Sequence, residues 1–160
     1  MRHCFLIFDY DNDLARAKQV AECGVVDAIA PAGFDDGSHW NAAAKKGTEA
    51  LNSLIDKALE GTSATVVLIG EHTAHRNYVD YAIERSIDRQ NGIVGFFIDD
   101  LTDENGKPGA RGPVPYEAAA AEKLEAGGYQ THAWDRSNFS EWVEEAATEW
   151  RRYARPKPLN

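Results

Sequence analysis

Carboxylates, phenols, an imidazole and a guanidinium follow two apolar runs of this sequence. The runs are HCFLIF, at residues 3–8, and VVLI, at residues 66–69. If both runs are parallel strands, their carboxyl ends meet at one edge of a sheet, which is where ligands bind in open α/β sheets. Besides parts of the segment 101–115, the groups that a ligand would meet there are Asp9, Tyr10, Asp11, Glu71, His72, Arg76 and Tyr78. Three chemistries can occupy such an edge.

Two of these chemistries fit the residues poorly. A phosphoreceiver site needs acids after the first strand, which Asp9, Asp11 and Asp13 supply for a Mg²⁺ ion. It also needs an aspartate ending the third strand and a lysine after the fifth, where this chain has Ile-Gly-Glu and Trp-Asp. An FMN site needs a phosphate loop rich in glycine and hydroxyl groups, whereas FDYDND places carboxylates there, which repel phosphate.

The third chemistry is a nucleotide held by aromatic stacking. Tyr10, Trp40 and Tyr78 offer flat faces, and Trp40 stands in a polar segment with few apolar neighbours, which favours a place outside the core. The cations that could meet a pyrophosphate are Lys45, Lys46, Arg76, Lys107 and Arg111. Each of these residues has an ordinary alternative as a helix cap, a core ring or a polar loop side chain.

A metal site is not expected. His72 and His75 are close in sequence, but neither a carboxylate nor a cysteine stands at ligand spacing on the same helix face. We interpret the two histidines as part of the start of a helix.

Five apolar runs alternate with five amphipathic helical segments, which predicts a three-layer α/β fold. We expect strands at 3–8, 25–30, 66–69, 92–99 and 129–134, and helices at 11–23, 48–59, 79–87, 116–126 and from 137 onward. The simplest arrangement is flavodoxin-like, with a five-stranded parallel sheet of order 2-1-3-4-5 and helices on both faces. Two long segments without periodicity, 31–47 and 101–115, are predicted to be functional loops.

Composition limits the class of partner. The 17 basic residues against 26 acidic ones argue against nucleic-acid or anionic-membrane binding. Two cysteines without a CxxC motif fit a reducing cytosol. Since neither a transmembrane run nor a signal-peptide pattern is found, we expect a soluble cytoplasmic protein. A single domain is predicted over residues 1–154, with a frayed tail at 155–160.

The motifs, in this order and spacing, resemble the TIR-like family of bacteria and archaea, which includes the TIR-like subunit of the Thoeris anti-phage systems. They are FLIFDYDND, VVLIGEHT followed by RNYVDYAI, GKPGARGPVPYE, the Trp40 segment before AAAKKG, and AWDRSNFSEWV. The resemblance implies a flavodoxin-like TIR fold and cleavage of NAD⁺ into nicotinamide and an ADP-ribose-derived, often cyclic, signal. NAD⁺ is the substrate of such a domain, and the resemblance implies no further cofactor. The signal is received by an effector protein. The resemblance is also compatible with assembly of the domain into a homo-oligomer.

The resemblance also implies a pocket and a catalytic position. The pocket residues would be Phe8, Asp9, Tyr10, Asp11, Trp40, Glu71, Arg76 and Tyr78. The family's glutamate follows the aromatic matched here by Tyr78 after four residues, and this chain has Ala82 at that position. A carboxylate there would stabilise the positive charge that develops on the ribose. We expect position 82 to face the cleft.

Two explanations fit Ala82. The chain is either a natural member that binds a nucleotide or a partner protein without cleaving NAD⁺, or a form in which the glutamate was replaced to trap a ligand. Glu71, in the loop, is an alternative acid. Glu84 points about 200° around the helix from position 82 and is not expected to substitute.

Overall fold

The computed structural model describes residues 1–115 and 129–148, and its core is one sheet of parallel strands. Five strands are hydrogen-bonded in the order β2-β1-β3-β4-β5, as the sequence predicts. The strands are β1 (His3–Ile7), β2 (Asp27–Ile29), β3 (Ala64–Ile69), β4 (Gly92–Phe97) and β5 (Gln130–Ala133). The flavodoxin-like fold and the central place of β3 are therefore confirmed.

The continuous apolar runs become strands covered on both faces. Every residue of β3 is buried, and Cys4 of β1 pairs with Ala64, which in turn pairs with Gly92 of β4. Gly92 is required because a side chain there would collide with the backbone of the last described helix: an added Cβ would lie 1.7 Å from the carbonyl oxygen of Ala146. The edge strands β2 and β5 are shorter and partly exposed.

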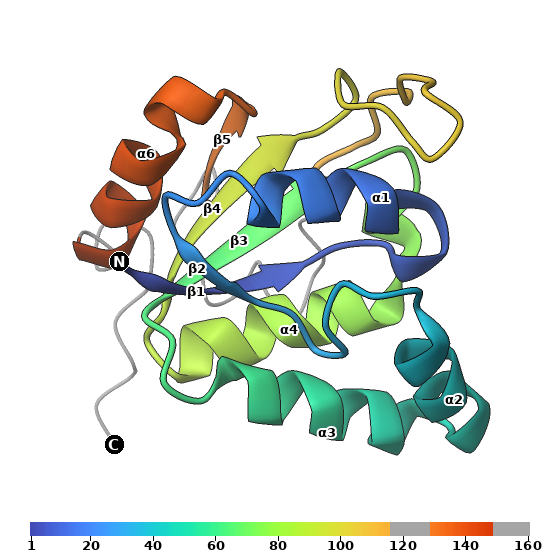
Figure 1. Ribbon diagram of the computed structural model, residues 1–160. Helices are drawn as coiled ribbons and strands as arrows, with labels where there is room; N and C mark the ends of the chain where they lie inside the picture. Colours follow the sequence, from blue (N-terminus) through green and yellow to red (C-terminus); the bar gives the residue numbers. More distant parts are fainter. Residues whose placement is uncertain (116–128, 149–160) are drawn as a thin grey trace, which may run out of the picture.

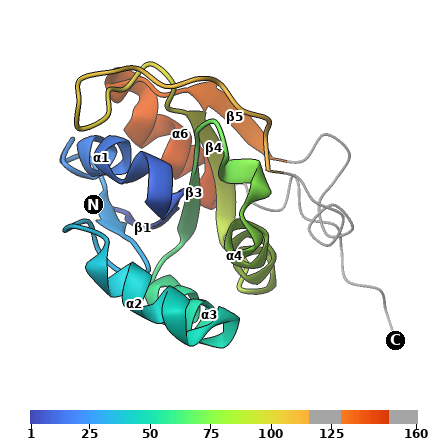
Figure 2. The same ribbon diagram turned by 90° about the vertical axis from the view of Figure 1, so that its right-hand side faces the viewer.

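Helices cover both faces of the sheet, giving three layers (Figures 1 and 2). Helices α1 (Tyr10–Ala21) and α6 (Arg136–Thr148) lie on one face. Helices α3 (Thr48–Leu59) and α4 (Asn77–Asp88) lie on the other, with α2 (Ser38–Lys46) beside α3. A 3₁₀ turn at Thr73–His75 precedes α4. None of these described helices is long and apolar enough to span a membrane.

The predicted loop over residues 31–47 is wrong, because it contains α2. This helix has only two buried residues, Trp40 and Ala43, so its apolar periodicity is too short to detect. Other boundaries shift by a few residues: α1 ends at Ala21, β2 covers only three residues, and β4 ends at Phe97.

Three predictions fall outside the described residues. These are the helix at 116–126, the frayed tail at 155–160 and the end of the domain at residue 154. The segment after β4, predicted to be a long loop, contains turns and one isolated antiparallel bridge between Thr102 and Pro108. We refer to residues 98–115 as the β4 loop.

Candidate functional site

Asp9 is the buried carboxylate at the carboxyl edge of the sheet. It follows β1 directly and caps α1, accepting a hydrogen bond of 3.1 Å from the backbone N–H of Asp11. Arg76 lies just before α4 and faces Asp9, with Nε 3.1 Å from Oδ1 and Nη2 3.3 Å from Oδ2. The strand order reverses between β1 and β3, so this ion pair lies at the switch point of the sheet. The Arg76 side chain is 33% exposed, which leaves one side of the pair accessible to a ligand.

Three aromatic side chains from three helices form a cluster beside this pair. Tyr10 stacks on Trp40, with ring centroids 4.3 Å apart and planes 9° apart, and Trp40 meets Tyr78 edge-on at 4.6 Å. The Tyr10 hydroxyl donates to the carbonyl of Gly33 and accepts from the N–H of Ala32, which ties the segment after β2 to α1. Tyr78 Oη in turn accepts the Tyr10 backbone N–H at 3.2 Å. Burial raises the pKa of both phenols, so both remain neutral and able to donate.

Trp40 lies inside the protein, and the interpretation that it stands outside the core is wrong. Its side chain is 3% exposed. The cause is α2, which begins at Ser38 after the N-cap residue Gly37. The carboxylate of Asp36, just before the cap, accepts the N–H of Ser38 at 2.9 Å. The helix then turns Trp40 and Ala43, three residues apart, toward the interior. Contact of Trp40 with a nucleotide remains a prediction.

Ala82 is fully buried, so the expectation that it opens on a cleft is wrong in this structure. Helix α4 buries it together with Val79, Ile83 and Ser86. Ser86 Oγ donates to the carbonyl of Ala82 and accepts from Thr65 Oγ1 of β3, both at 2.7 Å. Positions 82 and 86 share one side of a helix, so Ala82 lies on the side that faces the sheet. Its catalytic role remains a prediction.

The two other acids of the predicted pocket are more accessible. Asp11 is 64% exposed, with Oδ2 3.8 Å from Nη2 of Arg76, so it adds a second negative charge beside that guanidinium. Glu71 is also exposed and lies 3.8 Å from His72. Among the described residues, no group of three His, Cys, Asp or Glu side chains could hold a metal ion.

Phe8 and the predicted cations have different environments. Phe8 is fully buried, 4.4 Å from the Tyr10 ring by centroid and stacked on Phe34 at 6.0 Å. Of the cations, Lys45 and Lys46 end α2, while Lys107 and Arg111 belong to the β4 loop. The Arg111 guanidinium contacts Asp99 at 3.1 Å and lies 4.3 Å from the Phe97 ring centroid. The structure thus brings the aromatic cluster and the Asp9–Arg76 pair together, and leaves the other cations on separate segments.

Arg16 places a second guanidinium at the carboxyl edge of the sheet. In its local sequence, only an acid three residues earlier indicates that this arginine has a partner. That acid is Asp13, which the sequence offers only as a Mg²⁺ ligand in the phosphoreceiver alternative. Both side chains are almost completely buried, and Arg16 Nη1 lies 2.8 Å from Asp13 Oδ1. The i,i+3 spacing was the only sequence signal for this pair.

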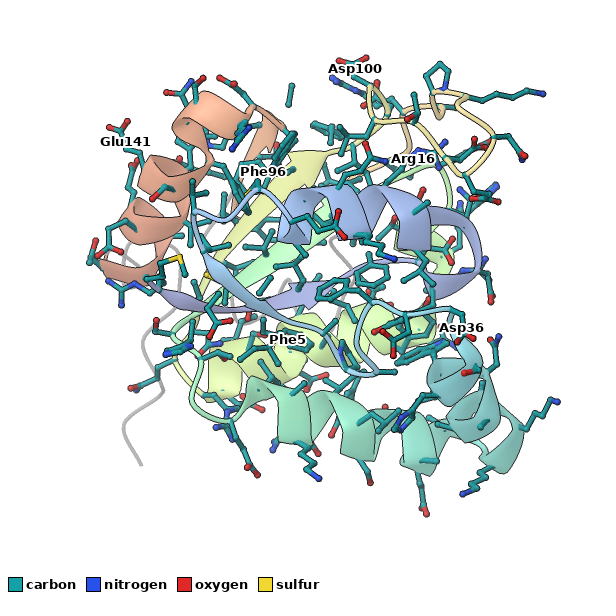
Figure 3. All side chains as sticks on the ribbon, in the orientation of Figure 1. Phe5, Arg16, Asp36, Phe96, Asp100 and Glu141 are labelled. Carbon is teal, nitrogen blue, oxygen red and sulfur yellow. The ribbon has the colours of Figure 1, made fainter. Side chains whose placement is uncertain are left out.

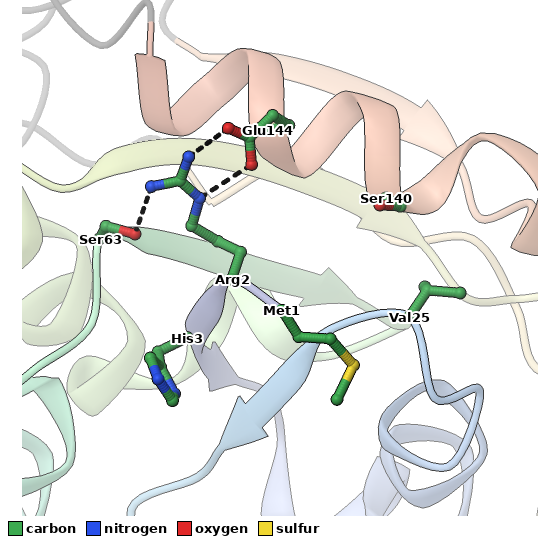
Figure 4. Close-up of a pocket in the computed structure, with 7 residues that line it drawn as sticks. All are labelled: Met1, Arg2, His3, Val25, Ser63, Ser140 and Glu144. Atoms are coloured by element: carbon green, nitrogen blue, oxygen red, sulfur yellow. Dashed lines mark hydrogen bonds and ion pairs between the residues drawn. The ribbon is translucent and has the colours of Figure 1, made fainter.

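A pocket opens at the opposite, amino edge of the sheet (Figure 4). Its residues are Met1, Arg2, His3, Val25, Ser63, Ser140 and Glu144. Arg2 closes its upper side through a two-pronged contact with Glu144 and a hydrogen bond of 3.1 Å to Ser63 Oγ. Since ligands of open α/β sheets bind at the carboxyl edge, we place the candidate site around Asp9 and not in this pocket.

Comparison with known families shows to which protein family the chain belongs. The family model for the Thoeris protein ThsB, TIR-like domain, matches residues 5–103, which is more than half of the chain. The chain belongs to this family. Every predicted pocket residue of this TIR-like domain, from Phe8 to Ala82, lies within the matched segment.

One curated relative of this TIR-like domain is the protein named "Putative cyclic ADP-D-ribose synthase ThsB1" from Bacillus cereus (strain MSX-D12). The two sequences are 41% identical over 86 residues. The match covers 54% of this chain and 45% of the relative, so it spans less than half of the length of that protein.

Proposed function

We propose that this TIR-like domain serves anti-phage defence by converting NAD⁺ into an ADP-ribose-derived signal, or by binding such a nucleotide. The observation that carries the proposal is the 41% identity to a protein named as a putative cyclic ADP-D-ribose synthase, within a family matched over residues 5–103. In such a system the partner of the domain is an effector protein that receives the nucleotide signal. We place the protein in the cytoplasm, where NAD⁺ is available.

The geometry of the carboxyl edge supports a nucleotide site. Arg76 and the start of α1 hold the Asp9 carboxylate, which is buried in this structure and which we propose to contact the ribose hydroxyls of a bound nucleotide. Tyr10 and Tyr78 supply neutral phenols and ring surface beside it. A phosphate would approach the exposed side of Arg76, where Asp9 and Asp11 already offset its charge, so we expect the β4 loop cations to contribute as well.

Catalysis needs a carboxylate near the ribose, and Ala82 supplies none. Positions 78 and 82 are one turn apart on α4, and the Cα–Cβ bonds of a helix tilt toward its N-terminus. The N-terminus of α4 lies at the carboxyl edge of the sheet. A glutamate at position 82 would therefore extend toward Tyr78 and the site. We propose that the domain with Ala82 is nearly inactive and that a glutamate at this position creates turnover.

The test compares the unaltered chain with Ala82→Glu and Ala82→Gln, following nicotinamide release from NAD⁺ by chromatography. An activating partner or phage trigger is supplied in parallel reactions. We expect release to be higher by about 10²–10³ with glutamate, because the carboxylate stabilises charge that develops in the transition state. Glutamine has nearly the same size without the charge, so equal rates for the two variants would remove position 82 from the mechanism and direct the search to Glu71.

The complete burial of Ala82 favours a non-catalytic alternative, which has two forms. Without a carboxylate at this position the domain would act as a nucleotide-binding or protein-interaction module of the same defence system. Titration calorimetry with NAD⁺ and ADP-ribose distinguishes the two modules. If neither variant releases nicotinamide and the unaltered chain still binds nucleotide, the binding module is correct. If no nucleotide binds, the interaction module remains.

A further inference from the structure

Arg16 and Asp13 form a buried ion pair on α1, and the contacts of the pair extend beyond that helix. Figure 3 labels Arg16, which lies between α1 and the β4 loop. Arg16 is 4% exposed and Asp13 is 1% exposed. Burying two charges is costly, and a buried pair is by itself weak evidence for added stability. The remaining contacts of each side chain therefore indicate what the pair does.

The Arg16 guanidinium holds two carbonyl groups of the β4 loop. Nε donates to the carbonyl of Leu101 at 2.9 Å, and Nη2 donates to the carbonyl of Lys107 at 3.1 Å. Gly109 passes directly over the guanidinium, since an added Cβ there would lie 3.2 Å from Cζ. One side chain of the first helix thus fixes two points of a turn that lie 85 and 91 positions later in the chain.

Asp13 connects the same place to the end of β3. Its Oδ1 accepts from Arg16, whereas Oδ2 is buried without a hydrogen-bond partner. That oxygen faces Gly70, where an added Cβ would lie 2.0 Å away. The β4 loop returns over the same point, because a Cβ on Gly112 would lie 2.3 Å from the carbonyl oxygen of Gly70. Helix α1, the end of β3 and the β4 loop therefore meet at Asp13.

The β4 loop is attached to the body of the protein at both ends: the N–H of Ile98 donates to the carbonyl of Ile69, and the Tyr129 hydroxyl donates to the carbonyl of Pro115. Between these ends, the Gln19 side chain donates to the carbonyl of Thr102, and Arg16 supplies the two hydrogen bonds described above. The charge on Arg16 strengthens its two hydrogen bonds, and its planar fork fixes their relative direction. Removing this side chain would release the loop at two points at once.

We propose that the Asp13–Arg16 pair positions the β4 loop as one wall of the nucleotide site, with Arg16 as a positioning residue that does not touch the ligand. The proposal rests on the proposed function, since the loop carries Lys107 and Arg111, two of the five cations that the sequence offers to a diphosphate. Arg16 binds the carbonyl of Lys107 itself, so the backbone that carries this cation is fixed before a ligand arrives. The recognised chemistry is the diphosphate shared by NAD⁺ and ADP-ribose.

The test measures hydrogen exchange of the β4 loop amides in the full chain. Arg16→Met should raise exchange of the amides of Asp103, Gly106 and Gly109 by about tenfold or more, because local opening no longer breaks two charge-assisted hydrogen bonds. Arg16→Lys keeps the charge beside Asp13 but has no fork to hold two carbonyls, so the loop should remain loosened. Arg85→Met is the matched control, since Arg85 pairs with Asp56 at the α3–α4 surface.

A double variant, Asp13→Asn with Arg16→Met, protects the test against global unfolding, because it leaves neither charge buried alone. In parallel, calorimetry should show NAD⁺ and ADP-ribose affinity falling about tenfold in Arg16→Met, as expected when a wall of the site is no longer preorganised. Unchanged loop exchange in a folded Arg16→Met or double variant overturns the positioning role. If the unaltered chain binds neither nucleotide while loop exchange still rises, the proposed function fails and the role of Arg16 is limited to fixing the loop.

Discussion

The rings of Tyr10 and Trp40 stack face to face, with centroids 4.3 Å apart and planes 9° apart. Two of the three aromatic faces that the sequence offers to a nucleotide are thus in contact with each other. A base or nicotinamide ring must therefore either separate them or bind along the outer edges of the cluster, beside Tyr78. In both cases Trp40 contributes to the folded state as well as to the predicted site.

Trp40→Ala is expected to destabilise the protein by about 3–5 kcal/mol, because it removes a large buried ring and leaves a cavity. Urea denaturation followed by circular dichroism measures the change. Trp40→Phe keeps one ring against Tyr10 and should lose much less. The same variants test ligand contact by calorimetry: a folded Trp40→Phe protein with undiminished NAD⁺ affinity would show that the indole is not part of the pocket.

Tyr78→Phe is expected to lower the free energy of unfolding by about 1–3 kcal/mol, since it leaves the partly buried N–H of Tyr10 without its acceptor. Tyr81→Phe is the control, because the Tyr81 hydroxyl contacts the partly exposed carboxylate of Asp56, which water and Arg85 can also satisfy. Equal losses in the two variants would show that the hydrogen bond to Tyr10 stabilises the protein no more than a partly exposed one.

Arg76→Met is expected to destabilise the protein more than Arg85→Met. Arg76 neutralises a fully buried carboxylate, and its loss leaves Asp9 buried with an uncompensated charge. Arg85 and Asp56 are both partly exposed, and such surface pairs contribute about 0–1 kcal/mol. Addition of Asp9→Asn should recover stability in the Arg76→Met background. Failure of that recovery in thermal unfolding would show that the charge of Asp9 is not the cause.

The sequence predicted those parts of the fold in which the type of each residue indicates whether its position is buried. The run at 66–69 lies inside β3, because a strand buried on both faces is apolar at every position, and helix 48–59 matches α3, because its apolar residues recur at the helical period. Helix α2 was missed because Trp40 is buried only through the path of the chain after β2, which the residue types of the helix do not indicate. Arg16 was missed for a related reason: its partners are backbone carbonyls, which are present at every position and leave no mark in the sequence.

The turn within the β4 loop is expected to loosen at acid pH. Asp103 Oδ1 accepts the N–H groups of Lys107 and Asn105, and these hydrogen bonds hold the pKa of Asp103 below its ordinary value of 3.8, the one from Lys107 first. Because the pKa is lower in the folded state, this contribution is present above the ordinary value and is lost as the pH falls through the folded pKa. In an NMR titration, the amide signals of both donors should shift with a midpoint below 3.8, and Asp103→Asn should abolish that transition.

Ala82→Glu is expected to show opposite pH dependences of stability and activity. The new carboxyl would begin at a fully buried position, so desolvation should raise its pKa, by up to about 3–5 units if it remains buried. A pKa raised in the folded state means that stability relative to Ala82→Gln is retained at low pH and is lost as the pH rises through that pKa. Only the ionised form can stabilise positive charge on the ribose, so nicotinamide release should increase over the same interval. Measurements of unfolding and nicotinamide release from pH 4 to about pH 8 test whether the two changes share one pKa. This range would include such a shifted pKa. A loss of stability without a matching increase in release would show that the carboxylate is buried away from the ribose, and release without any loss would show that it reaches solvent at the carboxyl edge.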